Sequence, residues 1–141
     1  MQSVNATDMR KDFGKYIDEI VRTKPVMVKR SRDYFLGISV DMMLELVEDV
    51  VFRAETFVED DGSVTLSLVD YDLVVNGKDR EDALTAMVTD LREYAQEYYD
   101  NIHFWSSDLL RRKQIKGILK VLLTEKDEAL KESIRCQAGE S

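Results

Sequence analysis

Basic side chains gather at two places in the first third of the chain, where they could contact nucleic acid. Arg10 and Lys11 stand near the start of an expected helix, and Lys29, Arg30 and Arg32 surround an expected hairpin tip. A guanidinium group can fork onto a guanine edge or a phosphate, and an ammonium group binds phosphate as a point charge. On spacing alone, a solvated helix face and a charged hairpin tip explain these residues better, because the first 50 residues hold 9 acidic side chains beside 8 basic ones.

Other kinds of chemistry find little support in the sequence. The one histidine, His103, stands beside aromatic residues, which favours a packing role, and Cys136 has no histidine near it in the sequence. Sulfur and imidazole ligands are therefore too few for a metal site. The pairs Asp60-Asp61 and Asp70/Asp72 fit turns and solvated charge better than a cation site. We predict that the protein is not an enzyme, with no catalytic residues, no cofactor and no metal.

The elements that would position the basic residues follow one another with almost no linker. A helix is expected from one apolar stripe at helical spacing, formed by Met9, Phe13, Tyr16, Ile17, Ile20 and Val21. Asn5 or Thr7 can cap this helix, and Lys24-Pro25 should end it. The remaining elements of this stretch are predicted as a strand at Gln2–Val4, strands at Val26–Arg30 and Tyr34–Val40, and a helix capped by Ser39 that reaches Val50.

This ordered set resembles the Phd/YefM antitoxin family over roughly the first third of the chain. The residues that carry the resemblance are Val4 to Phe13 (VNATDMRKDF), Pro25 to Arg30 (PVMVKR) and Leu36 to Asp41 (LGISVD). The chain departs from the family pattern at the hairpin tip, where Ser31-Arg32-Asp33 replaces the usual glycine, and at Met43, where the family has tyrosine.

The resemblance implies a βαββα unit that forms a homodimer and binds operator DNA. Arg10 and Arg30 match the arginines of the family motif, so the DNA-binding role is carried to them. Lys11, Lys29 and Arg32 are only their neighbours and are expected to contact phosphate. The implied function is that of an antitoxin in a type II toxin–antitoxin system, which neutralises a toxin and represses its own operon. The toxin partner in that family is often a basic ribonuclease of the RelE type or a Doc-like enzyme.

Two alternatives stay open at this stage. The first is a protein-interaction module that keeps the Phd-like dimer and has lost DNA binding, which the missing glycine at the tip would support. The second is an enzyme or small-ligand binder using the acidic middle of the chain, for which the sequence offers no positive sign. The family's toxin-binding tail is short, whereas roughly ninety residues follow here, so no toxin-contact residue can be transferred.

Composition and charge describe a globular chain with an uneven charge distribution. It has 141 residues, 44% apolar and 34% charged, and a net charge of −8. Residues 51–102 carry a net charge of −9, whereas residues 103–141 carry +2. No apolar run approaches the ~20 residues that span a bilayer, and a single cysteine suits a reducing compartment. We expect a cytoplasmic protein with no membrane partner.

The remainder of the chain is patterned as a second domain, so the expected domains are residues 1–50 and 51–141. The expected elements are strands at Val51–Glu59, Val64–Val69 and Asp72–Val75, turns at Asp60 to Ser63 and at Asn76-Gly77, a long helix capped by Asp79, a helix with the stripe Leu110, Ile115, Ile118, Leu119 and Leu122, a last helix through Ile134, and a frayed end at Gln137–Ser141. The middle block has a weak similarity to HicB antitoxins in its Asp-Gly hairpin and following helix. The predicted fold class is α+β, with a small antiparallel sheet, a long helix and C-terminal helices after the first unit.

Overall fold

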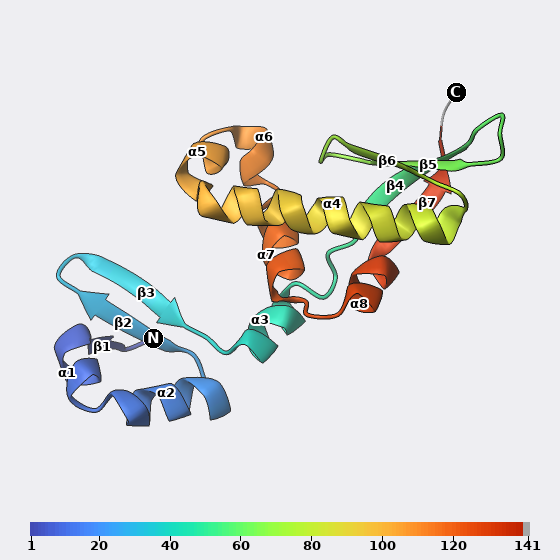
Figure 1. Ribbon diagram of the computed structural model, residues 1–141. Coiled ribbons are helices and arrows are strands. Elements are labelled where there is room, and N and C mark those ends of the chain that lie inside the picture. Colours follow the sequence, from blue (N-terminus) through green and yellow to red (C-terminus); the bar gives the residue numbers. More distant parts are fainter. Residues whose placement is uncertain (140–141) are drawn as a thin grey trace. The chain divides into compact units, whose positions relative to one another are not determined.

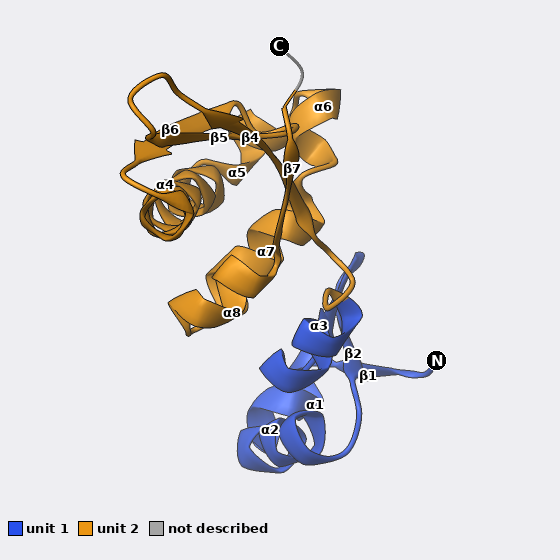
Figure 2. Ribbon diagram, turned by 90° about the vertical axis from the view of Figure 1, so that its right-hand side faces the viewer, with its two compact units in different colours: residues 1–46 blue, residues 47–141 orange. Residues whose placement is uncertain are grey.

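A computed structural model describes residues 1–139, which form two compact units, unit 1 (residues 1–46) and unit 2 (from residue 47 onward) (Figure 2). Residues 47–50, expected at the end of the first domain, belong to unit 2. Each unit combines a small sheet with helices, so the predicted α+β class is confirmed (Figure 1). Within the described residues, none of the helices has the length and apolar character needed to cross a membrane.

Unit 1 contains a three-stranded sheet, and its first two helices cover one face of it (Figure 1). Its elements are β1 (Ser3–Asn5), α1 (Ala6–Lys11), α2 (Phe13–Arg22), β2 (Val26–Arg30), β3 (Asp33–Gly37) and α3 (Val40–Leu46). Strand β2 lies in the middle, parallel to β1 and antiparallel to β3. The Ser39 hydroxyl accepts a hydrogen bond from the Met42 amide at 3.1 Å, which confirms the predicted cap of α3. The predicted strand Tyr34–Val40 was too long, because β3 ends at Gly37.

The single helix expected after β1 is divided into α1 and α2 at Asp12, whose φ of −138° and ψ of 54° are not helical. Asn5 occupies the N-cap position of α1, although its side chain makes no capping hydrogen bond. Met9 and Ile20 from the predicted stripe are buried against β2, whereas Phe13, Ile17 and Val21 are exposed. The sheet therefore buries only part of the predicted stripe.

The hairpin tip keeps a tight two-residue turn although it lacks glycine. Arg30 pairs with Asp33 in the β2–β3 register, so Ser31 and Arg32 alone form the connection. Ser31 takes a left-handed φ of 56°, a conformation that favours glycine in such turns. The departure from the family pattern therefore leaves the hairpin in place.

Unit 2 places a long helix under one face of a four-stranded sheet (Figure 2). Its described elements are β4 (Phe52–Val58), β5 (Val64–Leu68), β6 (Leu73–Gly77), α4 (Arg80–Asp100), α5 (Ile102–Ser106), α6 (Leu109–Arg112), α7 (Ile115–Leu123), α8 (Asp127–Glu132) and β7 (Ile134–Ala138). The strand order is β6-β5-β4-β7. Asp79 caps α4 as predicted, since its carboxylate accepts from the Asp82 amide at 2.8 Å. Leu91, Ala95 and Tyr98 of α4 are fully buried in the core.

Three expectations for the strands of unit 2 were wrong. Asn76-Gly77 does not turn the chain but continues β6. Ile134 does not belong to the last helix but begins β7, which pairs parallel to β4 and makes the sheet mixed. The end at Gln137–Ser141 was expected to be frayed, but Gln137 lies in β7. Residues 140–141 fall outside the described part of the chain.

The helix expected from the Leu110 stripe was also wrong in its extent. Three short helices, α5, α6 and α7, occupy this stretch. Ile118 is buried as the stripe predicted, but Leu110 is exposed.

Lys120 on α7 holds the segment that opens unit 2. Its ammonium group donates to the Glu48 carbonyl at 3.0 Å and to the Val50 carbonyl at 2.5 Å. Burial lowers the pKa of this lysine, and a buried ammonium requires such partners. The two hydrogen bonds tie residues 48–50 to the helix.

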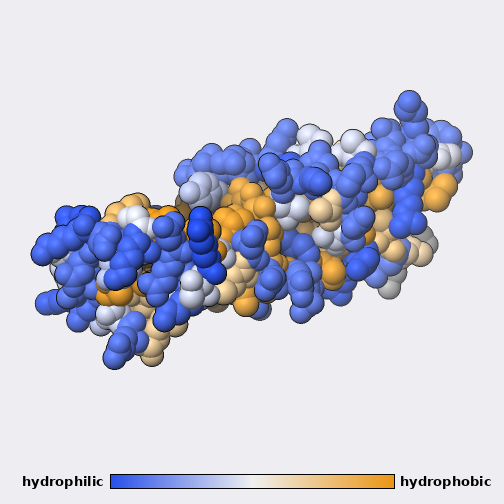
Figure 3. Space-filling view, turned by 90° about the horizontal axis from the view of Figure 1, so that it is seen from below, coloured by the Kyte–Doolittle hydropathy of each residue, from blue (hydrophilic) through white to orange (hydrophobic). Residues whose placement is uncertain are grey.

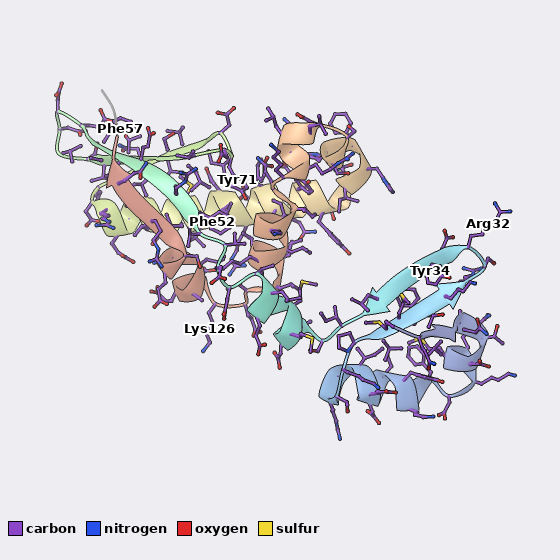
Figure 4. The ribbon with its side chains drawn as sticks, turned by 180° about the vertical axis from the view of Figure 1, so that it is seen from behind. Arg32, Tyr34, Phe52, Phe57, Tyr71 and Lys126 are labelled. Atoms are coloured by element: carbon purple, nitrogen blue, oxygen red, sulfur yellow. The ribbon has the colours of Figure 1, made fainter. Side chains whose placement is uncertain are left out.

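An aromatic row packs between the sheet and the helices of unit 2, and it gives a pH-dependent stability. Tyr71 meets Phe52 and Tyr94 edge to face, at centroid distances of 5.6 and 5.7 Å. Figure 4 shows Phe52 and Tyr71 near one another. Burial raises the pKa of Tyr71 from 10.0 to about 12. Between these values the folded state keeps a proton that the unfolded chain has lost, so stability falls as pH rises.

We therefore expect the free energy of unfolding to decrease between about pH 10 and pH 12, and to decrease less in Tyr71→Phe. Urea denaturation at several pH values measures both slopes. Equal slopes in the two proteins would show that Tyr71 is not the titrating group.

Candidate nucleic-acid interface

Arg10 and Arg30 come together at one exposed hollow of unit 1. Arg10 lies in the last turn of α1, and Arg30 ends β2 two residues after the fully buried Val28. Because side chains two apart on a strand share a face, Arg30 extends on the side of the sheet that the helices cover. The hollow has a volume of about 290 Å³, and Phe13 and Phe35 also line it. We call it the Arg10/Arg30 hollow.

The other three predicted residues lie around this hollow at different positions. Lys11 follows Arg10 and is exposed, and Arg32 extends from the hairpin tip (Figure 4). Lys29 alternates to the opposite face of β2, where its ammonium lies 5.6 Å from the centre of the Tyr34 ring. The structure thus brings Arg10 and Arg30 to one hollow. Lys11 lies on α1 and Arg32 lies in the β2–β3 turn, on the same elements that form the hollow, whereas Lys29 points to the opposite face of the sheet.

The charges of these five side chains are not neutralised within the described residues. The one ion pair found in unit 1 joins Lys24 and Glu19 at 3.7 Å. Arginine side chains that are exposed and lack carboxylate partners can donate to an external anion at little desolvation cost. The hollow can therefore receive a phosphate or a base edge.

The sequence did not single out the two aromatic walls of the hollow. Phe13 was assigned to the helical stripe, and Phe35 was placed only within a strand. The pairing register was the missing signal, because Phe35 lies directly opposite the buried Val28 and hence faces the helices. Both rings remain more than half exposed beside the arginines.

Comparison with known proteins extends the likeness beyond this unit. A family model described as PHD-like, the antitoxin of RelE/RelB toxin–antitoxin systems, matches residues 1–136. The chain belongs to this antitoxin family. The match spans both units, whereas the motif resemblance covered only the first third, so unit 2 is part of what the family shares.

The antitoxin also has a similar solved structure. A crystal structure at 1.80 Å resolution from Syntrophomonas wolfei subsp. wolfei, described as an antitoxin of a proposed toxin/antitoxin system, superposes with a TM-score of 0.93. The two chains are 35% identical, and the alignment covers 99% of this chain and 100% of the other. A search of curated proteins finds no match.

Unit 1 of the antitoxin exposes more large apolar side chains than it buries. Its buried cluster consists of Met9, Ile20, Val26 and Val28. Its exposed large hydrophobic residues are Met1, Phe13, Ile17, Val21, Tyr34, Phe35, Leu36, Val40 and Leu46. Figure 3 shows hydrophobic surface open among the charged side chains of this unit. A 46-residue unit with so small a core gains stability from any partner that covers this surface.

Proposed function

We propose that this antitoxin is a homodimer that represses its own operon by binding operator DNA through unit 1, and that it neutralises a cognate toxin. The observation that carries the DNA-binding part is the meeting of Arg10 and Arg30 at one exposed hollow. Both arginines matched the family motif on sequence, and they come from elements separated by α2.

Homodimerisation is supported by the exposed apolar side chains of unit 1. Phe13, Ile17 and Val21 recur every four residues along α2, so they form one continuous line on its surface. A second copy that covered Ile17 and Val21 would remove them from water, leave Phe13 open at the hollow, and bring a second hollow into the assembly. Two-fold symmetric dimers read two half-sites on one duplex, which raises both affinity and specificity.

In the complex, each arginine would do what its side chain chemistry allows. Arg10 and Arg30 can each fork onto a guanine edge or a phosphate, and both are assigned the sequence-reading role. Lys11 and Arg32 would bind flanking phosphates and fix the register. Lys29 would contribute least, because it lies over Tyr34 on the other side of the sheet.

Toxin neutralisation is supported by the family and by the charge of unit 2. Residues 51–102 carry a net charge of −9. Such a surface attracts a basic protein over a distance and speeds its association. We therefore propose that the cognate toxin is a basic protein, such as a basic ribonuclease.

The competing proposal is an interaction module that does not bind DNA, and its support came from the missing glycine at the hairpin tip. Ser31 takes the left-handed conformation that glycine would provide, so the tip is built without it. That removes the observation which favoured the competing proposal, and DNA binding stays the better supported function.

The salt dependence of binding tests the DNA part of this proposal. If Lys11 and Arg32 contact phosphates in both copies of a dimer, four phosphates are neutralised. The affinity for the antitoxin's own promoter should then fall about 100-fold between roughly 50 and 200 mM salt. Fluorescence anisotropy with a labelled duplex measures this slope. A flat salt profile would contradict the phosphate contacts.

A further inference from the structure

The helices α5 and α6 of unit 2 hold apolar side chains out in solvent. Phe104 is 73% exposed, Leu109 71% and Leu110 75%. Neither helix contributes a fully buried residue, and Trp105 is the residue of this segment that packs, partly buried, against the core. We call these three residues the α5–α6 surface. Large apolar side chains that are exposed close together in the chain are candidates for a site of protein contact.

This segment is firmly anchored, so the exposure does not result from loose packing. Trp105 packs at a right angle on Tyr94, with ring centroids 5.1 Å apart, and the Arg111 guanidinium lies 4.6 Å from the centre of the Trp105 ring. The Tyr98 hydroxyl donates to the Arg111 carbonyl at 2.8 Å, and Arg112 Nε donates to the Ser106 carbonyl at 3.0 Å. Rigid anchors lose little conformational entropy when a partner covers them.

A hollow adjoins the α5–α6 surface, because Leu110 belongs to both. It has a volume of about 770 Å³, and its lining includes Asp108, Leu110 and Tyr71. Asp70 and Asp72, on either side of Tyr71, have left-handed φ values of 72° and 55°, which fix the shape of the turn. A surface with protruding apolar side chains beside a hollow can be complementary in shape to a folded protein.

The charge around this surface is opposite in sign to that of the whole chain. Arg111, Arg112, Lys113 and Lys116 stand with the single acid Asp108 in residues 102–116, a net charge of +3, while the chain carries −8. None of these four cations belongs to an ion pair within residues 1–139. A partner that carries carboxylates at the border of an apolar contact would therefore complement this surface.

We propose that the α5–α6 surface is the docking site for the cognate toxin, and that the toxin, although basic as a whole, presents at this place an apolar groove bordered by carboxylates. This inference rests on the proposed toxin neutralisation. A second copy of the chain is the poorer occupant, because pairing this surface with itself would bring two +3 charges together. Duplex DNA is also poorer, because its phosphates could pair with the four cations but would leave Phe104, Leu109 and Leu110 with no apolar surface to cover them.

The test uses the full-length chain and the product of the open reading frame that adjoins its gene. Affinities for that protein are measured by titration calorimetry for the wild type, for Leu109→Glu and Leu110→Glu, and for Val58→Glu. Val58 is the matched control, because it is 75% exposed in the same unit but lies on β4. We expect each leucine variant to bind about 30-fold or more weakly, as contact hot spots do, and Val58→Glu to bind like the wild type.

The outcomes separate this surface from the proposed function as a whole. If the wild type does not bind the adjoining product, toxin neutralisation is contradicted and this surface falls with it. If the wild type binds and both leucine variants bind equally well, only this surface is overturned. A leucine variant that keeps its toxin affinity but loses promoter binding or changes oligomeric mass would assign the surface to DNA or to a second copy. Circular dichroism spectra that match the wild type show that the variants are folded.

Discussion

Replacing Arg10 and Arg30 together by alanine should lower the affinity of the antitoxin for its promoter by about 10³-fold. This value takes ~1 kcal/mol for each of the four guanidinium groups in a dimer, the lower end of the range for a bidentate base contact. Both side chains line one exposed hollow, and no carboxylate of the described residues pairs with them, so their loss should affect binding and spare the fold. Anisotropy titrations at fixed salt measure the change.

Two further variants show whether the arginines act by their chemistry or only by their charge. Arg22→Ala removes an exposed arginine at the far end of α2 and should change the affinity little. Arg10→Lys keeps the charge but cannot fork onto a base, so it should still bind much more weakly to the promoter than the wild type. If the double alanine variant binds the promoter as tightly as the wild type, the assignment of Arg10 and Arg30 is wrong.

Gly77→Ala should destabilise unit 2 by about 3 kcal/mol, the upper part of the range for overpacking. A Cβ at this position would collide with the backbone where α4 begins, with the Ala83 Cα and the Asp82 carbonyl carbon each 2.8 Å away. Backbone at the start of a helix cannot rotate aside as a side chain can. Urea denaturation followed by the fluorescence of Trp105, the one tryptophan of the chain, reports the stability of this unit.

Gly14 provides the contrasting substitution. It lies within α2, and nothing stands within 4 Å of the place its Cβ would occupy. Gly14→Ala should therefore stabilise the helix by about 0.5–1 kcal/mol. An unfolding midpoint unchanged by Gly77→Ala would show that the close approach of β6 and α4 is relieved at little cost.

The sequence predicted the elements whose signals are local. Asp79 caps α4 with its own side chain, and the predicted Asp60 to Ser63 turn holds Gly62 at a φ of 85°. Pro25 follows closely on the end of α2 at Arg22. Each of these signals depends on backbone chemistry within a few residues, so it can be read without knowing the fold.

The failures depend on contacts between distant segments. Gly77 was interpreted as a turn residue, whereas it is needed because β6 passes close to the start of α4. Ile134 was assigned to a helix because its spacing was suitable, but its parallel pairing with Phe52 of β4 joins residues 82 positions apart. Leu110 continued an apolar stripe in sequence and is nevertheless exposed. No local pattern distinguishes these cases.

The candidate site could be predicted only in part. Arg10 and Arg30 were identified through the family motif, and spacing alone favoured a solvated surface. The hollow that joins them depends on α1 lying against β2, and its Phe35 wall depends on the β2–β3 register. Lys29 was grouped with Arg30 because they are neighbours, yet the alternation of the strand sends the two side chains to opposite faces.

The composition of the promoter complex tests the central claim most directly, namely that unit 1 pairs with a copy of itself and thereby presents two sets of arginines to one duplex. Sedimentation velocity of the full-length chain with its promoter duplex gives the mass of the complex, and a random duplex of equal length serves as the comparison. We predict two chains on each promoter duplex and much weaker binding to the random one. One chain per duplex, or equal binding to both duplexes, would contradict the account.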